Sequence, residues 1–73
     1  MKKYLRLIEK AQTKLILKLR KKGIYENFGQ NEYRDFKDLV NADDSLSYGE
    51  KADLASRFSE MVDLVNKQSS KLI

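Results

Sequence analysis

The 73-residue chain contains no cysteine, no histidine and no proline. Without cysteine it has no disulfide bond or thiolate zinc site, and without histidine it has no imidazole ligand or general base. The absence of proline leaves long helices uninterrupted. A chain of this length forms one domain at most, and so small a core supplies only about 3–5 kcal/mol of net stability. We therefore expect stability to come from helix packing, or from burial against a partner.

Long apolar runs are also missing, which bears on the location of the protein. The longest uncharged apolar run near the amino terminus is Leu15–Leu17, whereas an export signal needs roughly 7–15 such residues. No stretch approaches the length of a membrane span. We therefore expect a cytoplasmic protein, and we do not expect a membrane partner.

The side chains left for catalysis are carboxylates, lysines, tyrosines and hydroxyls. No glycine-rich phosphate loop, paired-carboxylate pattern or metal-ligand spacing accompanies them. Asp43 and Asp44 are adjacent acids, but acids just before a helix normally interact with its dipole. We predict that the chain is not an enzyme and that it has no catalytic residues, no cofactor and no metal site.

The charge of the chain is concentrated at one end. Residues 1–22 carry nine basic residues against the single acid Glu9, a net charge of +8. Residues 23–73 carry six basic and ten acidic residues, a net charge of −4, so the whole chain has +4. Such a one-sided field favours phosphate, an acidic protein or the chain's own acidic part as the partner of the basic segment.

Residues 2–22 are predicted to form one long helix, because apolar side chains recur at helical spacing. The apolar arc comprises Tyr4, Leu5, Ile8, Ala11, Gln12, Leu15, Ile16 and Leu19. The opposite arc comprises Lys3, Arg6, Lys10, Lys14, Lys18 and Lys21. Gly23 is expected just after this helix, where glycine adopts the left-handed backbone at least cost.

Two later segments, Asn27–Gln30 and Ser47–Glu50, share the order of a capping residue, an aromatic, a glycine and Gln or Glu. This order predicts a capping box at each helix start. The helices would run over about 28–40 and about 48–67. The side chains expected to face inward are Phe28, Phe36, Leu39 and Val40 in the first of them and Leu54, Phe58, Met61 and Val65 in the second.

No stretch alternates at period two, so strands are not expected. The predicted fold is all-α: a small three-helix assembly in a single domain over residues 1–73, either monomeric or oligomeric. In the turn before the second helix, Tyr25 and Phe28 are expected to fill the core. Gly29 lowers helix propensity, which indicates that another segment passes close to its backbone.

The first candidate site is the basic face of the first predicted helix. It comprises Arg6, Lys10, Lys14, Lys18 and Lys21 and extends over about 20 Å. Such a face can bind phosphates in a salt-sensitive way. Lysine outnumbers arginine and no aromatic is interleaved, which weakens the case for specific nucleic-acid recognition. A solvated outer face is the alternative interpretation.

The second candidate site consists of leucines away from the apolar arcs, Leu7, Leu17 and Leu64. In a chain with so small a core they indicate contact with a partner or with a second copy. Single exposed leucines are also common on protein surfaces, and this interpretation stays open.

Residues 21–39 resemble a pattern in small uncharacterised accessory proteins of phages and other mobile elements of Gram-positive bacteria. The matching residues are Lys22, Gly23, Tyr25, Glu26, Asn27, Phe28, Gly29, Gln30 and Glu32. The resemblance implies a small accessory factor that acts by binding, and it implies no enzymatic activity.

Three hypotheses for function follow. The leading one is a non-enzymatic helical interaction protein that binds another protein or self-associates. The second is a small nucleic-acid-binding regulator that uses the basic face. The third is a structural piece of a larger assembly, which predicts that the chain folds poorly alone.

Overall fold

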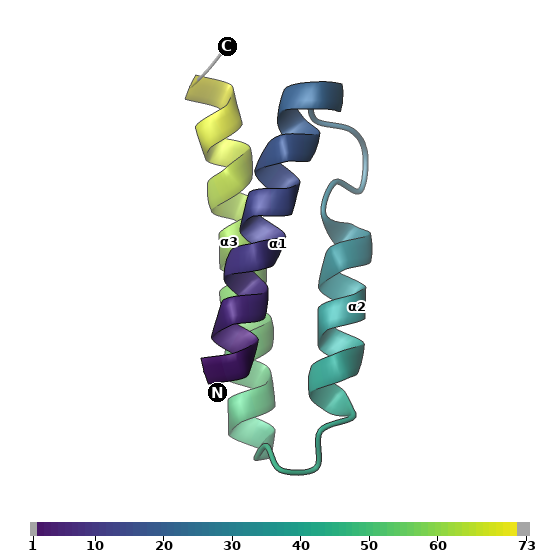
Figure 1. Cartoon of the computed structure of the whole chain (residues 1–73), viewed down its shortest axis with the longest axis vertical. Helices are drawn as coiled ribbons and strands as arrows, with labels where there is room; N and C mark the ends of the chain where they lie inside the picture. The colour runs from purple at the N-terminus through teal and green to yellow at the C-terminus, as the bar shows by residue number, and fades with distance from the viewer. Residues whose placement is uncertain (1, 72–73) are drawn as a thin grey trace.

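The chain folds into three helices, as predicted. The computed structural model describes the backbone of residues 2–71 and the side chains of residues 2–68. Helix α1 spans Lys2–Lys22, α2 spans Gln30–Asn41 and α3 spans Tyr48–Lys71 (Figure 1). The described residues contain no strand, so the fold is all-α.

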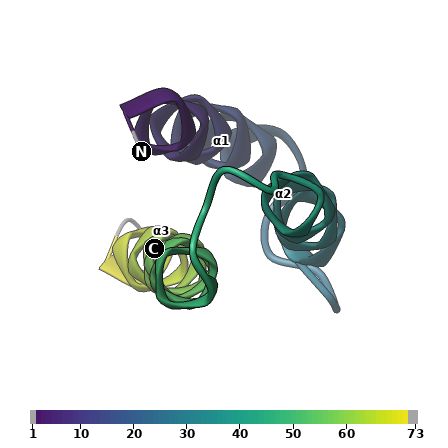
Figure 2. The same ribbon diagram turned by 90° about the horizontal axis from the view of Figure 1, so that it is seen from below.

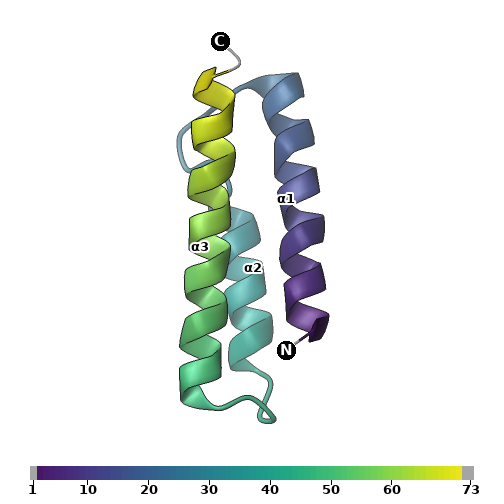
Figure 3. The same ribbon diagram turned by 90° about the vertical axis from the view of Figure 1, so that its left-hand side faces the viewer.

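The helices form an elongated bundle of 42 × 17 × 16 Å. The chain ascends α1, descends α2 and ascends α3, so α1 and α3 are parallel and α2 is antiparallel to both (Figures 1 and 3). Seen along its length the bundle is a triangle of three helices (Figure 2). Helix α3 packs against both α1 and α2, whereas α1 and α2 contact each other much less.

The core is built from one face of each helix and from the turn before α2. Its buried side chains are Tyr4, Leu15, Phe28, Phe36, Val40, Leu54, Phe58, Met61 and Val65. The ring of Phe36 stacks on that of Phe58 at a centroid distance of 4.8 Å, and Tyr4 meets Phe36 edge-on. The predicted inward stripe of α3 is confirmed in full.

Leu39 is a correction to the predicted inward face of α2. Its side chain is 46% exposed, although Phe36 and Val40 beside it are buried. The apolar face of α2 is narrower than predicted, because this short helix buries one side against α3 and contacts α1 weakly. Leu39 therefore lies at the surface on the flank of α2.

The predicted capping box at Asn27 is wrong. Helix α2 begins two residues later than expected, with Gly29 as its N-cap and no side-chain hydrogen bond at the cap. Asn27 has a left-handed backbone with φ of 64°, and its carbonyl accepts a hydrogen bond from the Gln30 amide at 3.1 Å. Residues 26–29 thus form a turn, so Asn27 serves turn geometry and not a helix cap.

Gly29 is buried in this turn and lies against α3. Its φ is 76°, and an added Cβ would lie 3.1 Å from Val62 Cγ1 and 3.7 Å from Leu15 Cδ1. The predicted close approach of another segment is therefore confirmed. Phe28 is buried as expected, but the expectation that Tyr25 fills the core is wrong: its side chain is 43% exposed, and its ring meets that of Phe28 edge-on at a centroid distance of 5.4 Å.

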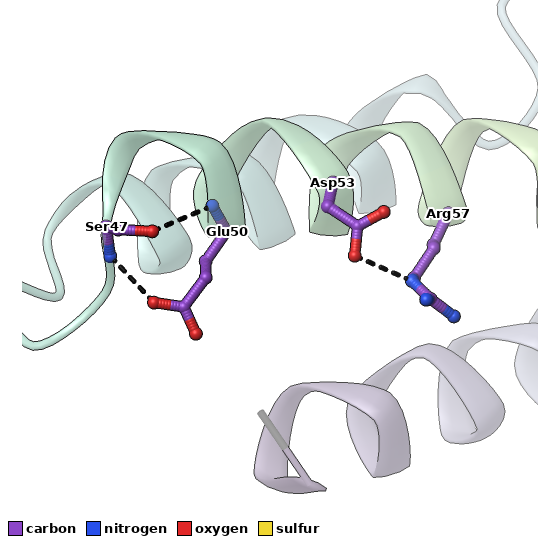
Figure 4. A network of polar contacts seen from close by, with 4 residues as sticks. All are labelled: Ser47, Glu50, Asp53 and Arg57. Atoms are coloured by element: carbon purple, nitrogen blue, oxygen red, sulfur yellow. Dashed lines mark hydrogen bonds and ion pairs between the residues drawn. The ribbon is translucent and has the colours of Figure 1, made fainter.

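The start of α3 has the predicted capping box (Figure 4). The Glu50 amide donates to Ser47 Oγ at 3.1 Å, and the Ser47 amide donates to Glu50 Oε1 at 3.0 Å. These bonds lower the pKa of Glu50, chiefly through the Ser47 amide. One turn on, Asp53 and Arg57 form an i,i+4 ion pair at 3.0 Å on the surface of α3.

The remaining helix ends agree with expectation at α1 and differ at α3. Helix α1 ends at Lys22, and the Gly23 amide donates to the Leu19 carbonyl at 2.9 Å with a φ of 73° at Gly23. Helix α3 continues to Lys71, four residues beyond the predicted end. The last buried apolar residue of its stripe is Val65, so the helix continues beyond the part of the sequence whose periodicity predicted it.

Candidate interaction surface

The basic face of α1 is largely open to solvent. Arg6, Lys10, Lys14 and Lys21 are exposed, and they lie at helical spacing along the outer side of α1. We keep the term basic face for these four residues. None of them forms an ion pair with a described residue.

Lys18 is a correction to this face. Its ammonium is partly buried in an ion pair with the Glu32 carboxylate of α2. The hydrogen bond to Glu32 raises the pKa of Lys18. Burial of Glu32 acts to raise the pKa of that carboxyl, but the hydrogen bond and positive charge of Lys18 outweigh it, and the pKa is lowered. Lys18 therefore joins α1 to α2 and is not free for a partner.

Sequence reasoning missed an acidic surface on α2. Asp35 and Asp38 are exposed one turn apart, and the half-exposed Leu39 lies one turn after Asp35. The i,i+3 and i,i+4 spacings of these three residues place them on one side of the helix. Of the two cations of α2, Lys37 is turned away, with its Nζ 5.9 Å from the Tyr33 ring centroid, whereas Arg34 is exposed at i,i+4 spacing from Asp38. We call Asp35, Asp38 and Leu39 the acidic face of α2. The acid spacing was visible in the sequence, but Leu39 was assigned to the core.

Lysines of α1 lie close to acidic residues of α2 and of the loop that follows it. The Lys18–Glu32 ion pair joins the two helices at one level, and the charge of Lys14 also lowers the pKa of Glu32. Near the start of α1, the charge of Lys3 lowers the pKa of Asp43, which follows α2. Opposite charges therefore meet along the side of the bundle where α1 and α2 lie next to each other.

Asp43 also ties the α2–α3 loop to the start of α1. Its Oδ1 accepts hydrogen bonds from the Ser45 hydroxyl at 2.6 Å and the Ser45 amide at 2.9 Å, and its Oδ2 accepts one from the Tyr4 hydroxyl. The Ser45 hydroxyl, followed by Tyr4, lowers the pKa of Asp43 to about 2. The hydrogen bond between Tyr4 and Asp43 also raises the pKa of the Tyr4 hydroxyl. Asp43 thus acts as a structural acceptor in the loop.

The three leucines proposed as contacts lie in different settings. Leu17 is 51% exposed among the lysines of α1, and Leu64 is 54% exposed on α3. Leu7 is partly buried and packs against the core cluster, so it offers less surface than expected. Leu39 presents an exposed apolar surface that the sequence analysis did not select.

A shallow groove of about 260 Å³ is bordered on one side by the turn before α2 and the start of α2, and on the other side by α3. Its polar lining is supplied by Asn27, Gln30, Tyr33, Ser59 and Asp63. Among residues whose placement is described, no three His, Cys, Asp or Glu side chains gather where they could hold a metal ion. Over the same part of the chain, no helix has the length and apolar character needed to cross a membrane.

Comparison with family models, with curated proteins and with solved structures found no match for this chain. The resemblance of residues 21–39 to small phage proteins is not tested by these comparisons and stays a hypothesis.

Proposed function

We propose that this chain is a non-enzymatic helical interaction protein of the cytoplasm that binds another protein or a second copy through the outer side of α1. The observation that carries the proposal is Leu17, which is 51% exposed at the centre of the basic face. A leucine flanked by Lys14 and Lys21 fits a surface that offers an apolar patch bordered by acids. A role as a phage or mobile-element accessory factor belongs to the same proposal and is supported by the resemblance of residues 21–39.

The exposed Leu17 among lysines favours a protein partner over a nucleic acid. A half-exposed leucine contributes to binding only when an apolar surface covers it, since that contact removes apolar area from water. The surrounding lysines add long-range attraction and orientation toward an acidic partner. A phosphate backbone would satisfy the lysines but leave Leu17 without an apolar contact. The combination of both features at one place therefore favours protein recognition.

The test measures the native mass of the 73-residue chain in solution and, with the chain immobilised, its affinity for a captured and identified protein. Leu17→Lys places a further charge at the centre of the basic face, and Ser56→Lys adds the same charge on the exposed surface of α3. We expect binding at least about tenfold weaker for Leu17→Lys and unchanged for Ser56→Lys. A wild-type monomer that binds no protein, or equal binding by all three forms, contradicts the proposal.

Nucleic-acid binding is the second candidate, and it is favoured by the exposure of all four basic-face side chains along about 20 Å of α1. Four phosphate contacts predict that the logarithm of the affinity falls with the logarithm of salt concentration at a slope of about 3–4. Gel retardation of duplex DNA at several salt concentrations measures that slope.

The variant for this candidate is Lys10→Glu/Lys14→Glu/Lys21→Glu. Lys18 is left in place because its loss would leave the partly buried Glu32 carboxylate without its ion pair. Loss of retardation in a variant that still melts cooperatively supports DNA binding. If retardation changes neither with salt concentration nor in the triple variant, DNA binding through the basic face is excluded.

A further inference from the structure

The side of the bundle formed by α1 and α2 carries opposite charges on its two helices. The basic face lies on α1 and the acidic face on α2, and the Lys18–Glu32 ion pair joins the two helices. Each also presents an apolar side chain, Leu17 on α1 and Leu39 on α2, both about half exposed. The surface is therefore basic on one half and acidic on the other, with apolar groups in each.

The charge pattern on this side of the bundle is complementary to itself under a two-fold rotation. When such a surface is rotated by a half turn about an axis parallel to the helices, its basic half falls on the acidic half of a second copy. The rotation keeps the height of each residue along the bundle and keeps α1 antiparallel to α2. Residues of α1 and α2 that lie at the same height within one copy, such as Lys18 and Glu32, therefore also lie at the same height across the interface between the two copies.

We propose that the occupant of this surface is a second copy of the chain, in a two-fold dimer in which the basic face of α1 packs on the acidic face of α2 of its partner. The contact forms twice, because each copy contributes both helices. Lys10 and Lys14 of one copy face Asp35 and Asp38 of the other, and Leu39 is covered by the opposing α1. This inference rests on the proposed function and names the partner of the same site.

The observations favour a second copy over a nucleic acid. A phosphate backbone that approached the basic face from the α2 side would also approach Asp35 and Asp38, which are exposed there and repel it. A second copy instead supplies two acids about one helical turn apart, as Lys10 and Lys14 are, and an apolar side chain next to Asp35 on the helix surface. Helices α1 and α2 pack against each other less than either packs against α3.

The first measurement is native mass by light scattering and sedimentation, from about 10 μM to about 1 mM protein. We expect the mass to rise from the 8.5 kDa of one chain to twice that value. Raising NaCl from about 50 mM to about 500 mM weakens the dimer at least tenfold, because salt screens the opposed charges. A mass of 8.5 kDa at every concentration and salt overturns the proposal.

The decisive experiment is a pair of charge reversals. Lys10→Glu/Lys14→Glu makes both helices acidic on this side, and Asp35→Lys/Asp38→Lys makes both basic. Each variant alone is expected to dimerise about a hundredfold more weakly, since like charges then face each other. Mixing the two variants restores a dimer that contains one copy of each. This rescue cannot result from misfolding.

The matched control is Glu60→Lys/Asp63→Lys, which makes the same charge change as the Asp35/Asp38 pair but on exposed residues of α3. It is expected to dimerise as the wild type does. A control that loses the dimer shows that net charge and not the paired faces controls the mass. A mixture that fails to restore the dimer shows that the two faces do not pair, and it overturns the proposal.

The outcomes also separate this inference from the proposed function. In one outcome the chain stays monomeric and binds an identified protein that the Leu17→Lys variant no longer binds. This result supports the proposed function and excludes a second copy as the partner. A monomer that binds no protein but retards DNA, with the retardation lost in Lys10→Glu/Lys14→Glu, contradicts both the proposed function and the dimer.

Discussion

Two glycines of this chain share a left-handed backbone but differ in their surroundings. Gly23 has φ of 73° with open space where a Cβ would stand, whereas Gly29 has φ of 76° and faces Val62 at 3.1 Å. Alanine at Gly23 therefore meets only the backbone cost, about 1–2 kcal/mol. Alanine at Gly29 adds the cost of displacing a packed core side chain, typically a further 1–3 kcal/mol.

We expect Gly29→Ala to lower the free energy of unfolding by about 2–5 kcal/mol and Gly23→Ala by about 1–2 kcal/mol. Urea unfolding followed by circular dichroism measures both. The double variant Gly29→Ala/Val62→Ala should cost less than the sum of the two single changes, because the smaller residue 62 makes room for the new methyl group. Equal losses for Gly23→Ala and Gly29→Ala would contradict the close contact.

At the scale of the helices, the two expected capping boxes give the clearest contrast. Ser47 and Glu50 form reciprocal hydrogen bonds at the start of α3, whereas Asn27 lies in a left-handed turn before α2. The same local order of residues thus leads to different structures. At α3 the capping Ser47 directly precedes the first helical residue, Tyr48, whereas at α2 the buried Phe28 and the left-handed Gly29 come between Asn27 and the start of the helix.

Ser47→Ala is expected to lower the free energy of unfolding by about 1 kcal/mol, within a range of about 0.5–2, because an N-cap hydrogen bond is lost. Ser56→Ala, on the exposed surface of the same helix, should be neutral or slightly stabilising, since alanine has the higher helix propensity. Thermal or urea unfolding distinguishes the two. A Ser47→Ala protein as stable as the wild type would argue against the cap.

At the scale of the whole molecule, Tyr4 and Asp43 join the first helix to the last loop across 39 residues of sequence. The pKa of Asp43 is about 2 in the folded chain, below its value of about 4 in the unfolded chain. A lowered carboxyl pKa stabilises the folded state above pH 4 and loses that contribution as the pH falls toward 2. The raised pKa of Tyr4 acts at the other extreme, where stability falls above pH 10.

The melting temperature should therefore be level between about pH 5 and about pH 9 and should fall on either side of this range. Tyr4→Phe removes the donor to Asp43, so it lowers the melting temperature at neutral pH and reduces the further loss between about pH 4 and about pH 2. Melting curves at half-unit pH intervals measure both effects. An acid profile that Tyr4→Phe leaves unchanged indicates that Ser45 alone holds the carboxylate.

The sequence by itself determined the three helices, their order and most of the buried face of α1 and α3, because helical periodicity and capping depend on residues three or four apart. Tertiary structure decided the rest: Leu39 at the surface, Lys18 paired with Glu32 and Gly29 against Val62. Each of these depends on how neighbouring helices are rotated and spaced. That arrangement results from packing between residues distant in sequence, which no local pattern encodes.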